Sequence, residues 1–349
     1  MPGRPDIVVV SLGTTMGLRG ADDALVSQLR AAGATCEIAR VEMGSSGRLR
    51  VRMALTDVVE GLAARRAAHQ VAGAVVYSSV TAALLQPSRT PSAVRFDATA
   101  ALNRPGPGGA WQRARERTVL RRADLLLPWS ETAQAAALGS AGPGAGPSVV
   151  LPPPVPAMPA PGSERFHAVA YAGNPRKRRL DLIFEAWRRA GPADARLAVG
   201  GIEQAEAARL LEGTGAEEPP GVEWLGPVSR ERWLRTVAGA RVFVNASDHE
   251  DWGIAQMEAL SAGVPLVTVP SAGGNIALPL ARALAPALVA EEVSGAALAR
   301  ALEAGLALDA QRREAYATGA TRLLEPYRDE ALRRRVADEV LPRLLASSS

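Results

Sequence analysis

Two glutamates with seven residues between them carry the richest chemistry in this chain. They are Glu250 and Glu258 of the segment Glu250-Asp-Trp-Gly-Ile-Ala-Gln-Met-Glu258. Glu250 follows the apolar run 242–245, so we expect it at the carboxyl end of a strand, where α/β proteins bind ligands. Glu258 falls near the start of an expected helix over 255–262, where the helix dipole favours a carboxylate. Because a carboxylate accepts two hydroxyl hydrogen bonds, the pair suits a sugar or ribose diol. The alternative is that Glu250 is a solvated loop residue and that Glu258 is simply an acidic residue at the N-terminus of a helix.

The single lysine of the chain points to a phosphate. Of the 40 basic residues all but Lys177 are arginine, and Lys177 lies in the loop Gly173-Asn-Pro-Arg-Lys-Arg-Arg179 behind an apolar run. An ammonium is a compact point charge that suits a phosphate oxygen. The alternative is a solvated basic turn before a helix. A phosphate-binding loop and a hydroxyl-binding pair together predict a nucleotide-sugar ligand.

The elements that must position these residues alternate short apolar strands with amphipathic helices, which is typical of α/β proteins with parallel sheets. The 349 residues are enough for two domains. We expect strands at residues 6–11, 35–41, 73–78, 93–96, 125–128, 148–151, 168–172, 196–199, 222–225, 242–245, 266–269 and 287–289. We expect helices at residues 21–32, 50–70, 110–122, 180–190, 204–211, 230–238, 255–262 and 295–306.

A proline-rich stretch, residues 152–161, separates the two halves. We therefore predict an N-terminal acceptor-side domain over 1–153, a linker over 154–163 and a C-terminal nucleotide-sugar domain over 164–325. The tail, 326–349, has apolar residues at helical spacing, Leu332, Val336, Val340 and Leu344. This apolar stripe must be buried somewhere.

The segment from Glu250 to Pro265 resembles the donor-binding signature of the group 1 (family 4-like) retaining glycosyltransferases. The family pattern is a glutamate, an aromatic-glycine pair two residues later, a second glutamate after seven intervening residues, and a small-residue run that ends in Gly-x-Pro. The resemblance implies the GT-B fold: two doubly wound Rossmann-like domains that face an interdomain cleft, with a C-terminal helix that crosses back to the first domain. It also implies that Glu250 contacts the transferred sugar and Glu258 the ribose diol. The donor would further contact Asp251, Trp252, Gly253 and Ile254.

The basic loop matches the family less closely. The family has Gly-Arg here and a Lys-Gly several residues later, and these two cations clamp the diphosphate. Lys177 corresponds to the lysine, whereas Asn174 stands at the arginine position. Arg176 or Arg178 are the candidates to replace that arginine.

The first domain contributes two further candidates. The glycines at positions 13, 17 and 20 do not have the spacing of a dinucleotide-binding fingerprint. A glycine loop before a helix can still bind an anion. In the family, the equivalent loop faces the donor diphosphate. Gly13 is therefore a donor-binding candidate, although a plain turn is the alternative. The family often has His-Asp after a central strand, whereas this chain has Phe96 and Asp97. Asp97 remains a catalytic, acceptor-side candidate beside Glu250 and Lys177.

A glycine-rich loop, residues 98–111, and the arginines at 113, 115, 117, 121 and 122 follow Asp97. They form either an acceptor-binding loop or a solvated basic helix. Residues 1–160 carry a net charge of +6 and the remainder −2, which together give the total of +4. A basic first half, with Arg48, Arg50 and Arg52 on it, leaves open contact with an anionic acceptor or a membrane surface. We expect no nucleic-acid partner.

The resemblance implies a metal-independent hexosyltransferase that uses a nucleotide-diphosphate sugar as co-substrate, with no other cofactor. Two alternatives stay open: a catalytically impaired sugar-nucleotide-binding module, and an epimerase or phosphorylase of the same fold. The lone Cys36 and the absence of a long apolar segment favour a cytoplasmic protein, or one at the inner membrane face. The excess of arginine over lysine is typical of a GC-rich bacterial genome.

Overall fold

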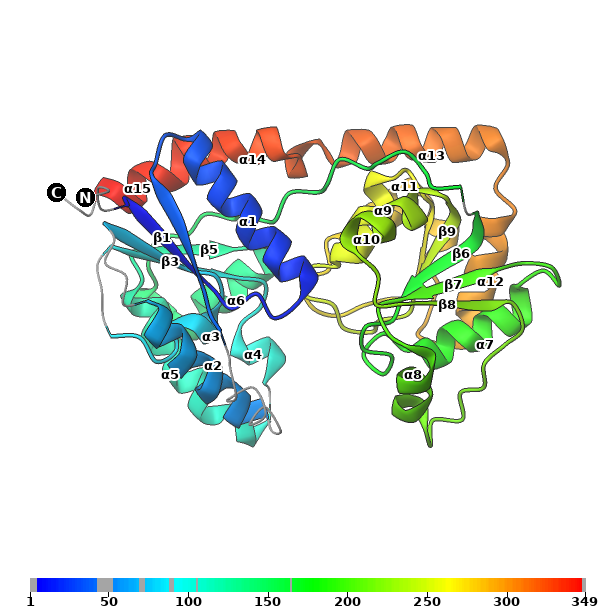
Figure 1. Ribbon diagram of the computed structural model, residues 1–349, viewed down its shortest axis with the longest axis horizontal. Helices are drawn as coiled ribbons and strands as arrows, with labels where there is room; N and C mark the ends of the chain where they lie inside the picture. Colours follow the sequence, from blue (N-terminus) through cyan, green and yellow to red (C-terminus); the bar gives the residue numbers. More distant parts are fainter. Residues whose placement is uncertain are drawn as a thin grey trace. The chain divides into compact units, whose positions relative to one another are not determined.

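The computed structural model describes residues 5–42, 53–68, 73–87, 91–104, 106–163 and 165–346. The chain divides into two compact units (Figure 1). The first contains residues 1–154 and 327–349, and the second contains residues 155–326. Residues 155–163 of the predicted linker thus count with the second unit, where Ser261 donates a hydrogen bond to the Pro156 carbonyl oxygen at 2.7 Å.

The first unit is built on a parallel sheet with the strand order β2-β1-β3-β4-β5. Its strands are β1 (Ile7–Ser11), β2 (Cys36–Arg40), β3 (Ala74–Tyr77), β4 (Ser92–Phe96) and β5 (Leu125–Pro128). Its helices before the linker are α1 (Met16–Ala31), α2 (Met53–Ala67), α3 (Val80–Ala83), α4 (Ala100–Asn103), α5 (Ala110–Arg122) and α6 (Glu131–Ala141). Helix α1 starts five residues before its predicted position because the Thr15 hydroxyl caps it by accepting a hydrogen bond from the Leu18 amide.

The second unit repeats the design with the order β10-β9-β6-β7-β8, again parallel throughout. Its strands are β6 (Phe166–Tyr171), β7 (Leu197–Gly200), β8 (Val222–Gly226), β9 (Ala240–Asn245) and β10 (Leu266–Thr268). Its helices are α7 (Leu180–Ala190), α8 (Gln204–Leu211), α9 (Arg230–Ala238), α10 (Ile254–Ser261), α11 (Ala277–Leu284), α12 (Gly295–Leu306) and α13 (Ala310–Leu323). The predicted α/β class with two parallel sheets is confirmed.

Two predicted strands are wrong. Residues 148–151 make one bridge, between Leu126 and Ser148, and residues 287–289 make one bridge, between Thr268 and Val289. Residues 148–151 still run beside β5, since the amides of Val149 and Leu151 donate to the carbonyl oxygens of Leu126 and Pro128. Residues 148–151 are flanked by prolines at 147 and 152, and Pro286 begins a 3₁₀ turn over Pro286–Leu288.

The C-terminal segment completes the core of the first unit. It runs through α14 (Asp329–Arg335), a π-helical turn (Val336–Val340) and α15 (Leu341–Ala346). Its four apolar residues Leu332, Val336, Val340 and Leu344 are fully buried in one cluster with residues of β1 and α1. The tail therefore packs on the first unit, as the resemblance to GT-B enzymes implied.

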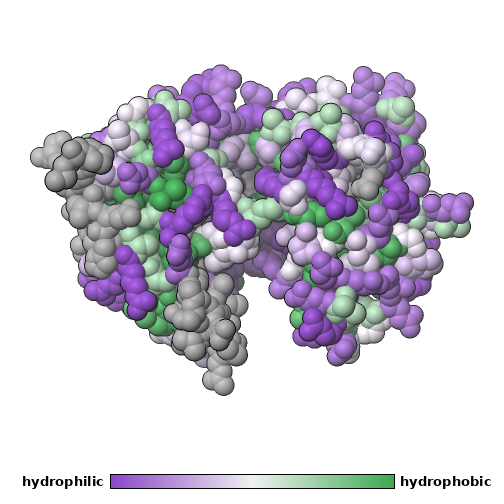
Figure 2. Space-filling view, viewed as in Figure 1, coloured by the Kyte–Doolittle hydropathy of each residue, from purple (hydrophilic) through white to green (hydrophobic). Residues whose placement is uncertain are grey.

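Hydrophilic side chains cover most of the face in view, with hydrophobic residues in scattered patches (Figure 2). Among the described residues, the exposed large hydrophobic side chains are those of Leu62, Leu138, Leu210 and Val293, which lie on different helices and loops. Within the described part of the chain, no helix is both long and apolar enough to cross a membrane.

Candidate functional site

The strand order of the second unit predicts where its ligand binds. The order reverses between β6 and β9, since the chain leaves β6 towards β7 and β8 and returns to β9 on the other side. The loops that follow two such strands diverge, and the crevice outside their carboxyl ends is where doubly wound sheets bind ligands. The loop after β6 carries Lys177, and the loop after β9 carries Glu250. The structure therefore brings the two sequence-predicted motifs together.

An ion pair joins these two loops. The Arg178 guanidinium donates through Nη1 to Glu250 Oε2 and, at 3.3 Å, to Ser247 Oγ. Its carbon Cζ lies 6.0 Å from the ring centroid of Tyr171 at the end of β6. Burial lowers the pKa of Arg178, while Tyr171 and Asp251 act in the opposite direction. Both charges are largely withdrawn from water, and Glu250 is only 6% exposed.

Backbone geometry explains why Arg178 faces the site. Asn174 closes a turn: its Oδ1 accepts a hydrogen bond from the Lys177 amide at 3.1 Å, and its carbonyl oxygen accepts one from the Arg178 amide at 2.9 Å. Arg179 then adopts φ 48°, and it is the one non-glycine among the described residues with a positive φ. Its guanidinium pairs with Asp181 at 2.9 Å and Asp248 at 3.3 Å, which holds this unfavourable conformation where α7 begins.

Lys177 lies at the exposed edge of the same cluster. Its Nζ is 3.7 Å from Asp251 Oδ2, and the other oxygen of Asp251 is 3.2 Å from His249 Nε2. Asp251 thus bridges a lysine and a histidine. Among the described residues, no three His, Cys, Asp or Glu side chains are grouped as a metal site would require.

The side chains of Arg176 and Asn174 form hydrogen bonds within the second unit. Arg176 Nε donates to the carbonyl oxygen of Leu210 on α8, so its side chain is occupied away from Glu250. The Asn174 side chain is occupied by the Lys177 amide. Of the two candidate arginines, the structure brings Arg178 to the glutamate.

The glycine loop between the two glutamates approaches the site with its backbone. Gly253 has φ 82° and directly precedes α10, which starts at Ile254, and Trp252 is buried beneath the loop. On the facing loop, a Cβ on Gly273 would lie 2.5 Å from the Glu250 carbonyl oxygen, so only glycine fits there. Gln256 Nε2, in the first turn of α10, is buried with no hydrogen-bond partner among the described residues.

Glu258 lies deeper, behind α9. Its Oε1 accepts a hydrogen bond from Arg230 Nη1 at 2.6 Å, and its Oε2 accepts one from Trp233 Nε1 at 2.8 Å. Burial raises the pKa of Glu258, although both partners oppose this shift. Trp233 also packs edge-on against Tyr171 with the ring centroids 5.3 Å apart. Tyr171 thereby connects the surroundings of Glu250 to those of Glu258.

Sequence reasoning missed Arg230 and Trp233. The signal was present, because Ser229 is a helix N-cap and places Arg230 and Trp233 three positions apart on one face of α9. Nothing in the linear sequence indicated that this face meets Glu258, which lies 25 residues beyond Trp233.

The two candidates from the first domain belong to the first unit. Gly13 has φ 49° in the loop between β1 and α1, and its carbonyl oxygen accepts a hydrogen bond from Arg19 at 2.9 Å. Asp97 follows β4, and its Oδ1 accepts a hydrogen bond from the Ala98 amide at 2.9 Å. Phe96, at the family's histidine position, is buried in the core.

Beneath these loops lies a buried charge network that the sequence did not reveal. Arg95 Nη1 lies 3.6 Å from Asp22 Oδ1, and Ser11 donates to Asp22 Oδ2 at 2.5 Å. Burial lowers the pKa of Arg95 to about 10, which Asp22 and Asp97 partly oppose. The network ties the ends of β1 and β4 to α1.

The arginines after Asp97 are mostly structural. Arg115 donates to the Leu84 carbonyl oxygen at the end of α3, and Arg117 and Arg121 donate to those of Ser140 and Ala141 at the end of α6. Arg113 donates to carbonyl oxygens of the preceding loop. Such bonds satisfy carbonyls that helix ends leave without partners. The other basic group, Arg48, Arg50 and Arg52, lies outside the described residues.

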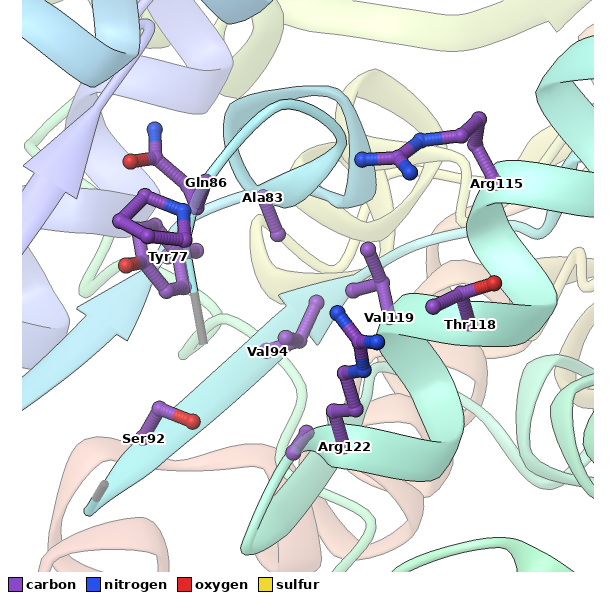
Figure 3. A pocket seen from close by; sticks show the side chains of 11 residues that line it. Tyr77, Ala83, Gln86, Ser92, Val94, Arg115, Thr118, Val119 and Arg122 are labelled. Carbon is purple, nitrogen blue, oxygen red and sulfur yellow. The ribbon is translucent and has the colours of Figure 1, made fainter. Parts of the chain in front are cut away.

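A small cavity of about 40 Å³ lies beside α5 in the first unit. Figure 3 shows Arg115 and Arg122 on one side of it and Tyr77 and Gln86 on the other. None of the catalytic or donor-binding candidates lines this cavity, although Arg115 and Arg122 belong to the basic group that follows Asp97.

Comparison with protein families assigns the second unit. Residues 166–325 match the family model described as Glycosyl transferases group 1, and this stretch contains Arg178 and both glutamates. The second unit thus resembles group 1 glycosyltransferases over most of its length, and the resemblance predicted from the sequence is confirmed. A sequence search of curated proteins found no match.

Solved structures share the fold over nearly the whole chain. Sucrose-phosphate synthase from Thermosynechococcus elongatus has a TM-score of 0.77 at 17% identity, covering 99% of this chain and 100% of its own. HepE from Anabaena, in complex with UDP and glucose, has a TM-score of 0.69 at 14% sequence identity, and the match covers 96% of this chain and 98% of HepE. WaaG, a glycosyltransferase involved in lipopolysaccharide biosynthesis, has a TM-score of 0.65 at 16% sequence identity, and the match covers 95% of this chain and 98% of WaaG. The predicted GT-B fold is confirmed.

Proposed function

We propose that this chain, with its GT-B fold and its resemblance to group 1 glycosyltransferases, transfers a hexose from a nucleotide-diphosphate sugar to an acceptor with retention of configuration. The observation that carries the proposal is the Arg178–Glu250 ion pair at the strand-order reversal of the second unit. It sets a phosphate-binding group beside a hydroxyl-binding group, as a nucleotide-sugar requires.

In this mechanism the diphosphate is the leaving group, and its charge grows as the bond to the sugar breaks. Arg178 and Lys177 would stabilise that charge, each by about 3–4 kcal/mol if it acts as a preorganised donor. Glu250 would accept hydrogen bonds from the sugar's hydroxyls and orient its anomeric carbon. We propose front-face attack by the acceptor, with the departing phosphate taking the acceptor's proton. The step requires no metal ion.

We further propose that Arg178 provides the guanidinium of the diphosphate clamp. The family's Lys-Gly pair puts glycine after the clamp cation, and glycine suits a left-handed backbone. In this chain the left-handed residue is Arg179, so by this criterion Arg178 occupies the clamp position that the sequence alone assigned to Lys177. The contact between Arg178 and Glu250 supports this assignment over Arg176.

The acceptor side is proposed from the first unit. Gly13 and Asp97 remain candidates there, and the capping bonds of Arg115, Arg117 and Arg121 weaken the case that these three bind an acceptor. The net positive charge of residues 1–160 supports an anionic acceptor or association with the inner membrane face.

The experiment is a donor screen. Purified protein is incubated with UDP-glucose, UDP-N-acetylglucosamine and GDP-mannose, and release of the nucleoside diphosphate is measured with and without an acceptor extract. UDP-sugars come first because the HepE structure contains UDP and glucose. Release that depends on acceptor and is lost in Arg178→Ala supports the proposal, with Arg188→Ala on the exposed face of α7 as the matched control.

The outcomes separate the alternatives. Binding of a donor without turnover would favour an impaired sugar-nucleotide-binding module. Conversion of the donor into an isomeric nucleotide-sugar without an acceptor would favour an epimerase. Conversion of the donor into a sugar phosphate in the presence of inorganic phosphate would favour a phosphorylase. Failure to bind any nucleotide would contradict the proposal.

A further inference from the structure

The two cations proposed to stabilise the diphosphate are each paired with a carboxylate of one loop. Arg178 contacts Glu250, and Lys177 contacts Asp251, the next residue along the chain. A diphosphate that binds these cations must therefore share each of them with a carboxylate or replace that carboxylate. The two ion pairs differ in burial and in length, and these differences decide which pair can open.

The pair between Arg178 and Glu250 can persist when a phosphate binds. The Glu250 side chain is 7% exposed and that of Arg178 is 22% exposed, and separating a buried ion pair is strongly unfavourable. A guanidinium carries five N–H donors in a planar fork. Arg178 can therefore keep its bond to Glu250 and still donate to a phosphate oxygen.

The pair between Lys177 and Asp251 has the opposite character. The Lys177 Nζ lies 3.7 Å from Asp251 Oδ2, beyond hydrogen-bond distance, and the lysine side chain is 43% exposed. An exposed pair of this kind contributes little stability, so it opens easily. Asp251 has a second partner, because its Oδ1 lies 3.2 Å from His249 Nε2. The lysine can thus leave while the aspartate stays in place.

We propose that Asp251 is a positioning residue that competes with the donor diphosphate for Lys177. It holds the ammonium at the edge of the site until a diphosphate replaces it as the counter-ion, and it takes the ammonium back when the nucleoside diphosphate leaves. The inference rests on the proposed function and adds to it a residue that favours product release. Repulsion between the carboxylate and a bound diphosphate acts in the same direction.

The sign of one affinity change tests this role. UDP, GDP and ADP are titrated calorimetrically beside their nucleosides, and the base that binds best is used. We expect Asp251→Asn to bind the diphosphate about five times more tightly than wild type does, since an exposed ion pair is worth up to about that factor. Nucleoside affinity should not change. Asp251→Glu keeps the charge and should restore the wild-type affinity, whereas a merely structural role would give weaker binding in both variants.

Asp248→Asn is the matched control. Asp248 lies in the same loop, its side chain is 51% exposed, and it pairs with Arg179 rather than with Lys177. Arg179 keeps its hydrogen bonds to Asp181 in this variant, so the turn that positions the basic loop is retained. The change removes the same charge without touching Lys177, and the diphosphate affinity should stay within about twofold of wild type.

The exchange can be observed directly because Lys177 is the only lysine in the chain. Lysine labelled with ¹³C at Cε therefore gives a single side-chain signal in an NMR spectrum. In the wild type, the diphosphate should shift this signal and the nucleoside should leave it unchanged. In Asp251→Asn, the signal should already be shifted before any nucleotide is added, because the counter-ion is gone.

The failures can be told apart. Diphosphate affinity in Asp251→Asn that equals or falls below that of wild type, with nucleoside affinity unchanged, would overturn the inference alone. A lysine signal that the diphosphate does not move would also overturn it and leave the proposed function intact. If Asp251→Asn does not fold, Asp251→Ser is tested with the same expectations. A wild type that binds none of the three nucleoside diphosphates would remove the proposed function itself.

Discussion

At the scale of single residues, position along the backbone decides which of the neighbouring cations contacts Glu250. Four consecutive basic residues follow Pro175, and the side chains of the first three reach three different partners. Arg176 reaches the Leu210 carbonyl oxygen, Lys177 reaches Asp251, and Arg178 reaches Glu250. The turn closed by Asn174 and the left-handed Arg179 create this divergence, because neighbouring side chains in a turn point in different directions.

Arg178→Met is therefore expected to weaken binding of a nucleoside diphosphate by tenfold or more, since a buried hydrogen bond to a charged group contributes about 1.5–3 kcal/mol. Binding of the nucleoside alone should change little because it has no phosphate. Arg176→Met is the matched control and should stay within about twofold of wild type, as Arg176 contacts only a backbone carbonyl. Isothermal titration calorimetry measures both. Equal losses in the two variants would refute the assignment of Arg178 to the clamp.

At the scale of elements, α5 organises the part of the first unit that surrounds α3, α4 and α6. Its arginines donate hydrogen bonds to carbonyl oxygens at the ends of α3 and α6. Its Glu116 accepts a hydrogen bond from the Ala100 amide at 2.7 Å, where α4 begins. Burial raises the pKa of Glu116 from 4.5 to about 7, against the opposing effects of that amide and of Arg104. A carboxyl group on α5 thus holds the segment that follows Asp97.

This raised pKa makes stability depend on pH. The folded state binds the Glu116 proton more tightly than the unfolded state does, so the contribution is fully present below about pH 4.5 and is lost as pH rises towards about 7. The loss is at most about 3 kcal/mol. Glu116→Gln keeps an acceptor for the Ala100 amide but does not titrate, so its free energy of unfolding should exceed that of wild type more at pH 8 than at pH 5.

Urea unfolding at the two pH values measures this difference. Asp22 and Glu258 also have raised pKa values, so the variant is compared with wild type at each pH and the difference isolates Glu116. If wild type and variant shift in parallel between the two pH values, Glu116 is not the titrating group.

At the scale of the whole molecule, the two ends of the chain fold together. Residues 327–349 belong to the first unit although 172 residues of the second unit, 155–326, precede them. Leu332, Val336, Val340 and Leu344 join the cluster that contains Ile7 and Leu25. The first unit is therefore incomplete until the last residues have been added.

Leu332→Ala is expected to destabilise the first unit by about 2–5 kcal/mol, the usual cost of such a cavity in a core. Hydrogen exchange locates the effect: amides of β1 and α1 should lose protection, while those of β6 and α12 keep theirs. Arg334→Ala is the control, because that side chain is exposed on the same helix and its pair with Glu330 is on the surface. Lost protection in β6 and α12, with β1 unchanged, would argue against this assignment of the tail.

The sequence by itself determined the repeated α/β architecture, the two glutamates and the basic loop, because each rests on local periodicity or spacing along the chain. It also indicated that the apolar tail must be buried. Its two strand errors fell at short apolar runs that lie next to prolines, 148–151 and 287–289. Tertiary structure alone decided that Arg178 rather than Arg176 meets Glu250, that Arg230 and Trp233 enclose Glu258, and that Arg95 is buried on Asp22. These pairings join residues 25 to 73 positions apart through turns and strand order, which no local pattern encodes.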